Sequence, residues 1–269
     1  MKRKYINFML NCEEIMRIEN FKEICIMRVF FFSTCLGASA CADTCINSIK
    51  LLQKEGVEVV FKKDQTCCGQ PAFNSGYYDE ARKVALHQMN LFKGNEPVIL
   101  PSGSCTGMMR VDYIELFKGT EYEAQAREFS KRVYELSEFL DSVLKVKYED
   151  KGQKVKVTWH SNCHALRVAK CIDSAKNLIK SLKNVELIEL DREEECCGFG
   201  GTFSIKEPEI SNAMVSRKIE DIKSKNVEYL LSADAGCLMN ISGAMKKQGI
   251  DLKAMHWYDF LAQRIGIGA

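Results

Sequence analysis

Eight of the thirteen cysteines in this 269-residue chain fall into two sets of four with nearly equal spacing. Each set contains an adjacent Cys-Cys pair followed by glycine, one cysteine 32 or 33 positions upstream, and one cysteine 37 or 40 positions downstream. Cysteine thiolates bind metal ions and iron–sulfur clusters, and four thiolates per site is the usual number. We therefore predict metal binding at a first set, Cys35, Cys67, Cys68 and Cys105, and at a second set, Cys163, Cys196, Cys197 and Cys237.

The spacing within the sets favours iron–sulfur clusters over zinc. Structural zinc sites usually carry pairs of cysteines separated by two to four residues. Here an adjacent pair is flanked by distant single cysteines, which departs from that habit. We expect one or two iron–sulfur clusters, and zinc stays an alternative, above all at the first set.

Glycines follow both Cys-Cys pairs. Gly69 and Gly198 permit a tight turn that can bring two adjacent sulfurs toward one site. Gly198, Gly200 and Gly201 imitate a dinucleotide-binding loop, but Phe203 stands where the third glycine of that motif is required. We assign all four glycines to close approach of the backbone to a bound cluster.

Two histidines flank the upstream cysteine of the second set only. His160 and His164 align with Phe32 and Leu36 of the first half. They are candidates for catalytic residues, as hydrogen-bond donors or proton carriers at a cluster. The competing interpretation is that one caps local backbone and the other is exposed.

A third candidate is Asp234, which stands three residues before Cys237, as Ser102 stands three residues before Cys105. The oxygen of either side chain can touch an iron. It can also simply begin the helix that follows. The sequence leaves both interpretations open.

Alternating strand-like and helix-like runs must position these residues. Strand-like runs at 28–35, 57–61 and 97–101 each lead to a cysteine position, and a helix-like run follows at 40–54. This alternation predicts a parallel sheet with flanking helices. Because ligands bind beyond the carboxyl ends of such strands, we expect the cysteines of each set to converge at one edge.

The second half of the chain repeats the first. Aligned residues are offset by 128 at Cys35 and Cys163, by 129 at the Cys-Cys pairs, and by 132 at the downstream cysteines. A slowly drifting offset indicates duplication with small loop insertions. We predict an α/β fold of two tandem pseudo-repeats, 28–150 and 151–269, each a small parallel sheet flanked by helices.

Composition places the chain among globular proteins, with 46% apolar and 28% charged residues. A net charge of +2 gives no indication of nucleic acid as partner. The longest apolar run, 29–32, is far too short to span a bilayer. Glu13 and Glu14 interrupt the stretch that could resemble a signal peptide, so we expect a cytoplasmic protein with reduced thiols.

Residues outside the two matched sets carry no pattern. We expect residues 1–27 to form an extension outside the core, and translation that starts at Met27 would explain it equally well. Cys12 and Cys25 lie in that extension. The other three unmatched cysteines have no counterpart in the opposite half, and we expect small buried hydrophobic residues there. They are Cys41, Cys45 and Cys171.

The Cys-Cys-Gly units resemble the cysteine-rich domains of heterodisulfide reductase and of the iron–sulfur component of glycolate oxidase. Residues 28–269 are more closely similar to the lactate utilization protein A family. The runs that carry this resemblance are 66–72, 101–105, 195–203 and 233–240.

The resemblance implies an iron–sulfur subunit that oxidises L-lactate to pyruvate together with a ferredoxin-type iron–sulfur subunit and a third subunit. Ser102 and Asp234 replace a cysteine of the heterodisulfide reductase pattern, so each site offers four thiolates instead of five. An ordinary 4Fe-4S cluster is therefore the simpler expectation. The alternatives are a zinc-binding module for assembly or redox sensing, and a subunit like that of heterodisulfide reductase.

Overall fold

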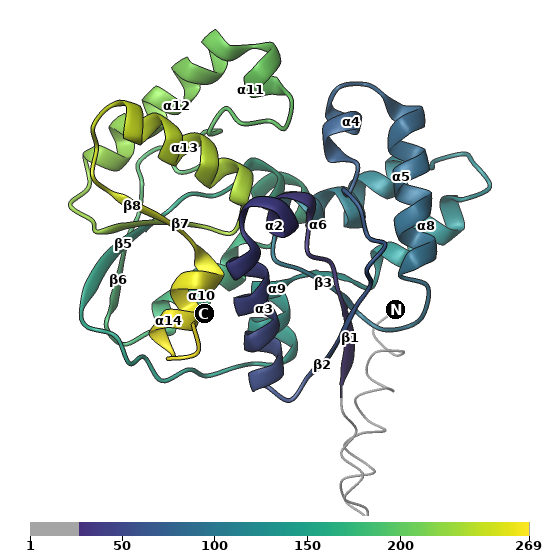
Figure 1. Ribbon diagram of the computed structural model, residues 1–269, viewed down its shortest axis with the longest axis horizontal. Helices are drawn as coiled ribbons and strands as arrows, with labels where there is room; N and C mark the ends of the chain where they lie inside the picture. The colour runs from purple at the N-terminus through teal and green to yellow at the C-terminus, as the bar shows by residue number, and fades with distance from the viewer. Residues whose placement is uncertain (1–26, 269) are drawn as a thin grey trace, which may run out of the picture.

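The computed structural model of the protein describes residues 27–268. Residues 1–26 of the expected extension, which include Cys12 and Cys25, lie outside the described residues. Two four-stranded parallel sheets, one in each half of the chain, are flanked by helices (Figure 1). Their strand orders, β2-β1-β3-β4 and β6-β5-β7-β8, are the same when the halves are aligned. The prediction of an α/β fold with two tandem repeats is confirmed.

The first half alternates strands with helices, and η denotes a short π-helical turn. In chain order its elements are β1 (Arg28–Phe31), α2 (Cys35–Ala40), α3 (Ala42–Lys54), β2 (Glu58–Phe61), α4 (Gln70–Asn74), α5 (Tyr78–Leu91), β3 (Val98–Leu100), α6 (Gly103–Gly107), η1 (Met108–Asp112), α7 (Tyr113–Leu116), α8 (Glu123–Ser130), β4 (Val133–Glu135), α9 (Leu136–Glu138) and η2 (Phe139–Val143).

The second half follows the same plan with fewer helices between its strands. In chain order its elements are β5 (Val155–Trp159), η3 (Ala165–Ala169), α10 (Ile172–Ser181), β6 (Val185–Ile188), α11 (Phe203–Lys206), α12 (Pro208–Lys223), β7 (Tyr229–Ser232), α13 (Ala235–Lys247), β8 (Lys253–His256) and α14 (Trp257–Arg264). Among these described helices, none has the length and apolar composition that a membrane span requires.

The structure differs from the sequence prediction at two kinds of place. Each sheet has a fourth strand, β4 or β8, at one edge. These strands have only three or four residues and include charged ones, so no apolar run marks them in the sequence. The helix predicted over 40–54 is interrupted at Cys41, because a separate short helix, α2, begins directly at Cys35.

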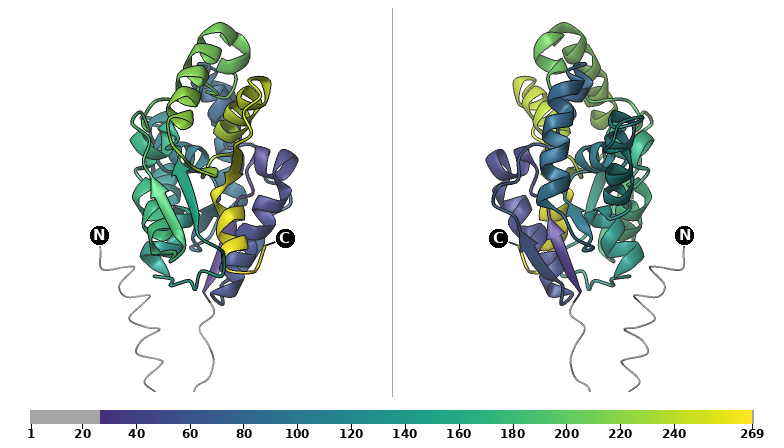
Figure 2. Two further views of the ribbon diagram at one scale, coloured as in Figure 1. Left: turned by 90° about the vertical axis from the view of Figure 1, so that its left-hand side faces the viewer. Right: turned by 90° about the vertical axis from the view of Figure 1, so that its right-hand side faces the viewer.

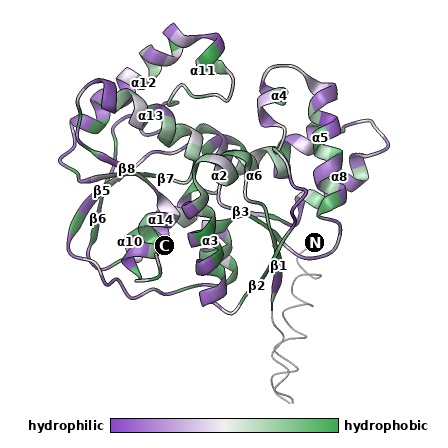
Figure 3. Ribbon diagram, in the orientation of Figure 1, coloured by the Kyte–Doolittle hydropathy of each residue, from purple (hydrophilic) through white to green (hydrophobic). Residues whose placement is uncertain are grey.

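Central strands of the sheets are buried and strongly apolar. In β1, Phe30 and Phe31 pair with Val98 and Ile99 of β3. Figure 3 shows β1 and β3 mainly in the hydrophobic colour. Strands of parallel sheets are covered on both faces, which explains these continuous apolar runs.

The two halves share a hydrophobic core. Helices α3 and α14 come from different halves and lie side by side in the middle of the molecule (Figure 1, Figure 2). Asp259 of α14 accepts hydrogen bonds from Thr44 at 2.6 Å and from Asn47 at 2.8 Å, both in α3. One cluster of buried side chains includes Val29, Phe31, Leu51, Trp159, Trp257 and Leu261. Burial of apolar surface therefore stabilises the halves against each other.

The last residues of β4 and β8 occupy matching places in the two halves. Glu135 accepts a hydrogen bond from the backbone N–H of Ser137 at 2.7 Å, and so caps α9. His256 Nδ1 accepts one from the backbone N–H of Tyr258 at 3.4 Å, and so caps α14. Both side chains are buried. The hydroxyl of Tyr258 also donates to Glu135, which links the two caps across the halves.

Candidate metal centre

Both cysteine sets line one cavity of about 110 Å³, where residues of the two halves meet. The sequence predicts convergence within each set, because all the relevant strands end at the same edge of a sheet. It does not predict that the two sets share a cavity. The matched cysteines that line it are Cys35, Cys67, Cys68, Cys105, Cys163, Cys196, Cys197 and Cys237.

In the first set, thiol hydrogen bonds run from Cys35 through Cys67 and Cys68 to Cys105. Cys35 and Cys68 donate to Cys67 and lower its pKa, which favours the thiolate form of Cys67. The neighbouring thiols of Cys105 and Cys67, and then burial, raise the pKa of Cys68. The four thiols thus share protons instead of ionising together.

The second set has the same arrangement. Thiol hydrogen bonds join Cys163 to Cys196, Cys196 to Cys197, and Cys197 to Cys237. Cys163 and Cys197 donate to Cys196 and lower its pKa, whereas the hydrogen bond with Cys196 raises that of Cys197. Four thiolates this close repel one another unless a cation joins them. The donor set therefore fits a metal ion or an iron–sulfur cluster.

The downstream cysteine of each set lies in the first turn of a helix. The hydroxyl of Ser102 accepts a hydrogen bond from Cys105 N at 3.4 Å at the start of α6. The carboxylate of Asp234 accepts one from Cys237 N at 3.3 Å at the start of α13. Both polar residues therefore begin helices, which was one of the two open interpretations.

Asp234 also joins the two halves. Its carboxylate accepts hydrogen bonds from Ser102 Oγ at 3.2 Å and from the backbone N–H of Ser104 at 3.3 Å. The hydroxyl of Ser104 donates to it as well. Gly103 is necessary at this junction, because a Cβ there would lie 2.4 Å from Cβ of Ala165. Asp234 thus connects the helix that carries Cys237 to the loop before Cys105.

Gly69 and Gly198 act through their backbone. Both have positive φ, 91° and 82°, which glycine adopts without strain. Their N–H groups donate to the sulfurs of Cys67 and Cys196, each at 3.4 Å, and so stabilise thiolate charge. A Cβ at Gly198 would lie 2.7 Å from the carbonyl oxygen of Ser211 in α12, so this glycine also permits close packing outside the cavity.

The other two glycines of the predicted group, Gly200 and Gly201, do line the cavity. Both have positive φ, 54° and 69°. A Cβ on Gly201 would contact Pro71 of the first half at 3.6 Å. The hydroxyls of Thr202 and Ser75 are 2.8 Å apart, so this loop closes against α4.

His160 lies at the end of β5 and is fully buried. Neither ring nitrogen has a hydrogen-bond partner among residues 27–268. Burial, and secondarily the nearby charge of Lys218, lower the pKa of His160 to about 3, so the ring is neutral. Its nitrogen lies within 4.8 Å of the sulfurs of Cys197 and Cys237, which themselves lie within that distance of each other. His160 is therefore neither exposed nor a backbone cap.

His164 has a different role. Its Nε2 donates to the carboxylate of Asp112 at 2.6 Å, and both side chains are mostly buried. Gly107 lets the ring approach α6, because a Cβ there would lie 2.5 Å from it. The pair joins η1 of the first half to the start of η3 in the second, and His164 also lines the cavity.

Sequence reasoning missed several residues at the cavity. Asn162 and His256 line it, and the side-chain nitrogen of Asn162 is buried without a hydrogen-bond partner in the described part of the chain. The available signal was position, since Asn162 directly precedes Cys163. Cys41 and Cys45 also line the cavity. Cys45 and Cys171 are buried as predicted, but Cys41 is only half-buried, so the prediction is wrong for that residue.

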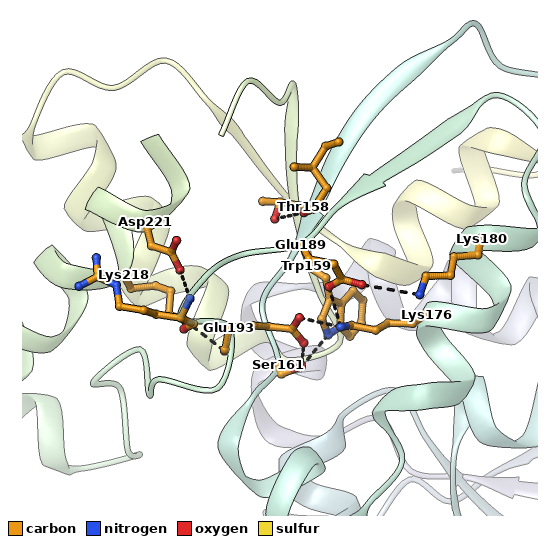
Figure 4. A network of polar contacts seen from close by, with 11 residues as sticks. Thr158, Trp159, Ser161, Lys176, Lys180, Glu189, Glu193, Lys218 and Asp221 are labelled. Atoms are coloured by element: carbon orange, nitrogen blue, oxygen red, sulfur yellow. Dashed lines mark hydrogen bonds and ion pairs between the residues drawn. The ribbon is translucent and has the colours of Figure 1, made fainter. Parts of the chain in front are cut away.

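A polar network holds the loop 191–195, which precedes the second Cys-Cys pair in the chain (Figure 4). Lys218 is fully buried, and its ammonium group donates to two carbonyl oxygens of the loop. Asp221 accepts hydrogen bonds from two backbone N–H groups of the loop at 3.1 and 2.8 Å. Glu193 pairs with Lys176 at 2.6 Å. The network holds in place the backbone that leads to the second Cys-Cys pair at the cavity.

Two stretches, 29–110 and 157–242, match the family of the Cysteine-rich domain, CCG. Each stretch contains one complete cysteine set and one sheet core. The fold and the site therefore define a protein with two CCG cysteine-rich domains.

Closer relatives extend the match to nearly the whole chain. The chain is 43% identical to lactate utilization protein A of Oceanobacillus iheyensis, over 87% of this chain and 96% of that protein. It is 42% identical to lactate utilization protein A of Geobacillus sp. (strain WCH70), over 88% and 100%. The chain belongs to the lactate utilization protein A family.

A solved structure supports the fold. A hypothetical protein from Helicobacter pylori aligns with a TM-score of 0.62 at 9% sequence identity. The alignment covers 89% of this chain and 49% of that protein, so the chain spans about half of its length. At this identity the likeness shows a shared fold.

Proposed function

We propose that this chain is an iron–sulfur subunit that transfers electrons in lactate utilization. The observation that carries the proposal is the pair of four-thiol sets around one cavity. A bound cluster would accept and release single electrons. The chain would contribute the thiolates, the N–H groups of Gly69 and Gly198, and a partly buried surrounding.

A 4Fe-4S cluster at each set is the form that we propose. Each set offers four thiols, and the oxygens of Ser102 and Asp234 are already engaged as helix caps. Two clusters in one cavity would lie close enough to exchange electrons. This arrangement suits a two-electron reaction whose electrons leave one at a time.

Oxidation of L-lactate to pyruvate is the reaction that the relatives' name supports. It releases two electrons and two protons, so each of two clusters can take one electron. We propose a ferredoxin-type iron–sulfur subunit and a third subunit as partners. The eleven described cysteines are free, and we place the complex in the cytoplasm, where thiols stay reduced.

Zinc binding for assembly or redox sensing is the second candidate. One observation favours it: the ligand atoms of His160, Cys197 and Cys237 lie within 4.8 Å of one another, which suits a single ion. Neutral imidazole and thiolate are both common zinc ligands.

Lactate-dependent bleaching of the visible absorption tests the proposal. The subunit is purified without oxygen, mixed with the two partner subunits, and given L-lactate. We expect the brown colour of oxidised clusters to bleach as the clusters are reduced. A colourless protein, or a colour that lactate does not change in the complete mixture, would contradict the proposal.

A further inference from the structure

The surroundings of His160 point to a ligand that the polypeptide does not supply. The backbone N–H of His160 donates to Leu231 O at 2.8 Å, and its carbonyl accepts from Ser232 Oγ at 2.9 Å. The residue is thus fixed in place, while both ring nitrogens are buried and unpartnered within the described residues. A buried polar group without a hydrogen-bond partner destabilises the folded protein. Retaining two of them requires a compensating interaction.

Packing alone does not require a histidine here. The aligned residue of the first half is Phe32, which is fully buried in an apolar cluster. Its ring packs edge-on against Phe92 at 5.9 Å between centroids. The same place in the fold therefore accepts a purely apolar ring. A polar ring in the second half must serve another purpose.

Two cysteine sulfurs lie close to the ring. One ring nitrogen of His160 and the thiols of Cys197 and Cys237 all lie within 4.8 Å of one another. Both cysteines belong to the second set. Imidazole nitrogen and thiolate sulfur bind iron together in several kinds of protein site.

We propose that a ring nitrogen of His160 binds an iron of the second cluster, beside Cys197 and Cys237. This inference rests on the proposed iron–sulfur function. The second cluster would then have five protein ligands, His160 and four cysteines, so that one iron carries two of them, and the first cluster would have cysteine alone. Clusters with histidine ligands have higher reduction potentials. We therefore expect electrons to move from the first cluster to the second.

Pulsed electron paramagnetic resonance of the reduced holoprotein tests this ligation. The protein is prepared with ordinary histidine and with histidine labelled with ¹⁵N. A directly bound nitrogen gives a strong hyperfine coupling that changes with the isotope. We expect that coupling in the wild-type protein, which needs no variant to fold.

Two variants assign the coupling, since the chain has four histidines. His160→Phe copies the residue of the first half, and we expect it to remove the coupling and lower the potential of one cluster. His256→Phe is the matched control, because His256 is also a buried histidine and lines the cavity that the cysteine sets line. We expect the control to keep the coupling.

The outcomes separate this inference from the proposed function. Labelled wild-type protein without a strong histidine coupling would overturn the ligation, as would a coupling that survives in His160→Phe. If iron and sulfide are present in that case, electron transfer stands and only the ligation falls. If the protein contains neither iron nor sulfide, both fall.

Discussion

The two cysteine sets share a cavity and a pattern of sulfur contacts, yet their surroundings differ in polarity and charge. Near the first set, Phe32 takes the place that His160 takes near the second. Ser102 stands where Asp234 stands on the other side. Duplication thus kept the ligands and changed their environment. Because hydrogen bonding and charge tune cluster potential, the two sites are suited to different tasks.

The loops that deliver the two Cys-Cys pairs differ in the same way. Before the first pair, neutral groups hold the loop: Gln65 accepts from Ser33 N at 2.7 Å, and Gln88 donates to Thr66 at 2.6 Å. Before the second pair, the buried Lys218 and its charged neighbours hold it (Figure 4). We infer that the second site performs the redox work, and that the first relays electrons to it or is structural.

Loss of a ligand in the second set should have the largest effect. We expect Cys197→Ser, and likewise Cys196→Ser, to remove the second cluster and abolish lactate-dependent activity, since a serine oxygen is a poorer ligand for iron. Cys171→Ser is the control, because Cys171 is buried outside both sets. Iron analysis and activity assays check this. Full iron and full activity in either ligand variant would reject the assignment.

The downstream cysteines test the division of labour. We expect Cys105→Ser to reduce thermal stability at least as much as activity, and Cys237→Ser to abolish activity while most of the fold remains. Thermal unfolding and lactate-dependent electron transfer are measured in both variants. A stable but inactive Cys105→Ser, with an unstable Cys237→Ser, would reverse the roles.

The helix caps Glu135 and His256, at the ends of β4 and β8, should make the stability of the protein depend on pH in opposite directions. Burial raises the pKa of Glu135 to about 7, so its contribution to stability is lost as pH rises from about 4.5 to 7. Burial lowers the pKa of His256 to about 4, so stability is lost as pH falls from about 6.5 to 4. Each of these two pKa shifts corresponds to a change of about 3 kcal/mol in the free energy of unfolding.

Urea unfolding between pH 4 and 8 measures both effects. We expect Glu135→Gln to remove the loss toward neutral pH, and His256→Gln to remove the loss toward acid pH. Parallel stability curves for the wild type and both variants would show that neither group titrates as its burial implies.

Much of the fold and of the cysteine site could be predicted from the sequence, and particular residues show which parts could not. Cys67, Cys68 and Cys105 follow apolar strands, and parallel topology then requires them to meet at one edge. The common cavity depends on contacts between halves, such as that of Asp234 with Ser102, which no periodicity encodes. The edge strand β4, which ends at Glu135, is too short and too polar to be predicted from an apolar run in the sequence.

His160 and His164 show the same limit of prediction from sequence. Their proximity to Cys163 was visible in the sequence, but their partners were not. Asp112, which binds His164, lies in the other half of the chain. The unpartnered state of His160 is a property of packing in three dimensions.

A single added methyl group at the junction between the halves should lower the stability of the protein. We expect Gly103→Ala to destabilise the protein by about 1–3 kcal/mol, because its Cβ would collide with Ala165. Gly243→Ala is the matched control: this helical glycine has open space around it, and alanine there should stabilise by about 0.5–1 kcal/mol. Chemical denaturation of both variants provides the comparison. Equal stability of the two would argue against a tight junction.

Iron and acid-labile sulfide content tests the central claim most directly. The wild-type protein is purified without oxygen beside two variants that each lack one Cys-Cys pair, Cys67→Ser with Cys68→Ser and Cys196→Ser with Cys197→Ser. We expect about eight irons and eight sulfides per wild-type chain, from two four-iron clusters, and about half of each in either variant. Wild-type protein that contains zinc and no sulfide would contradict the account.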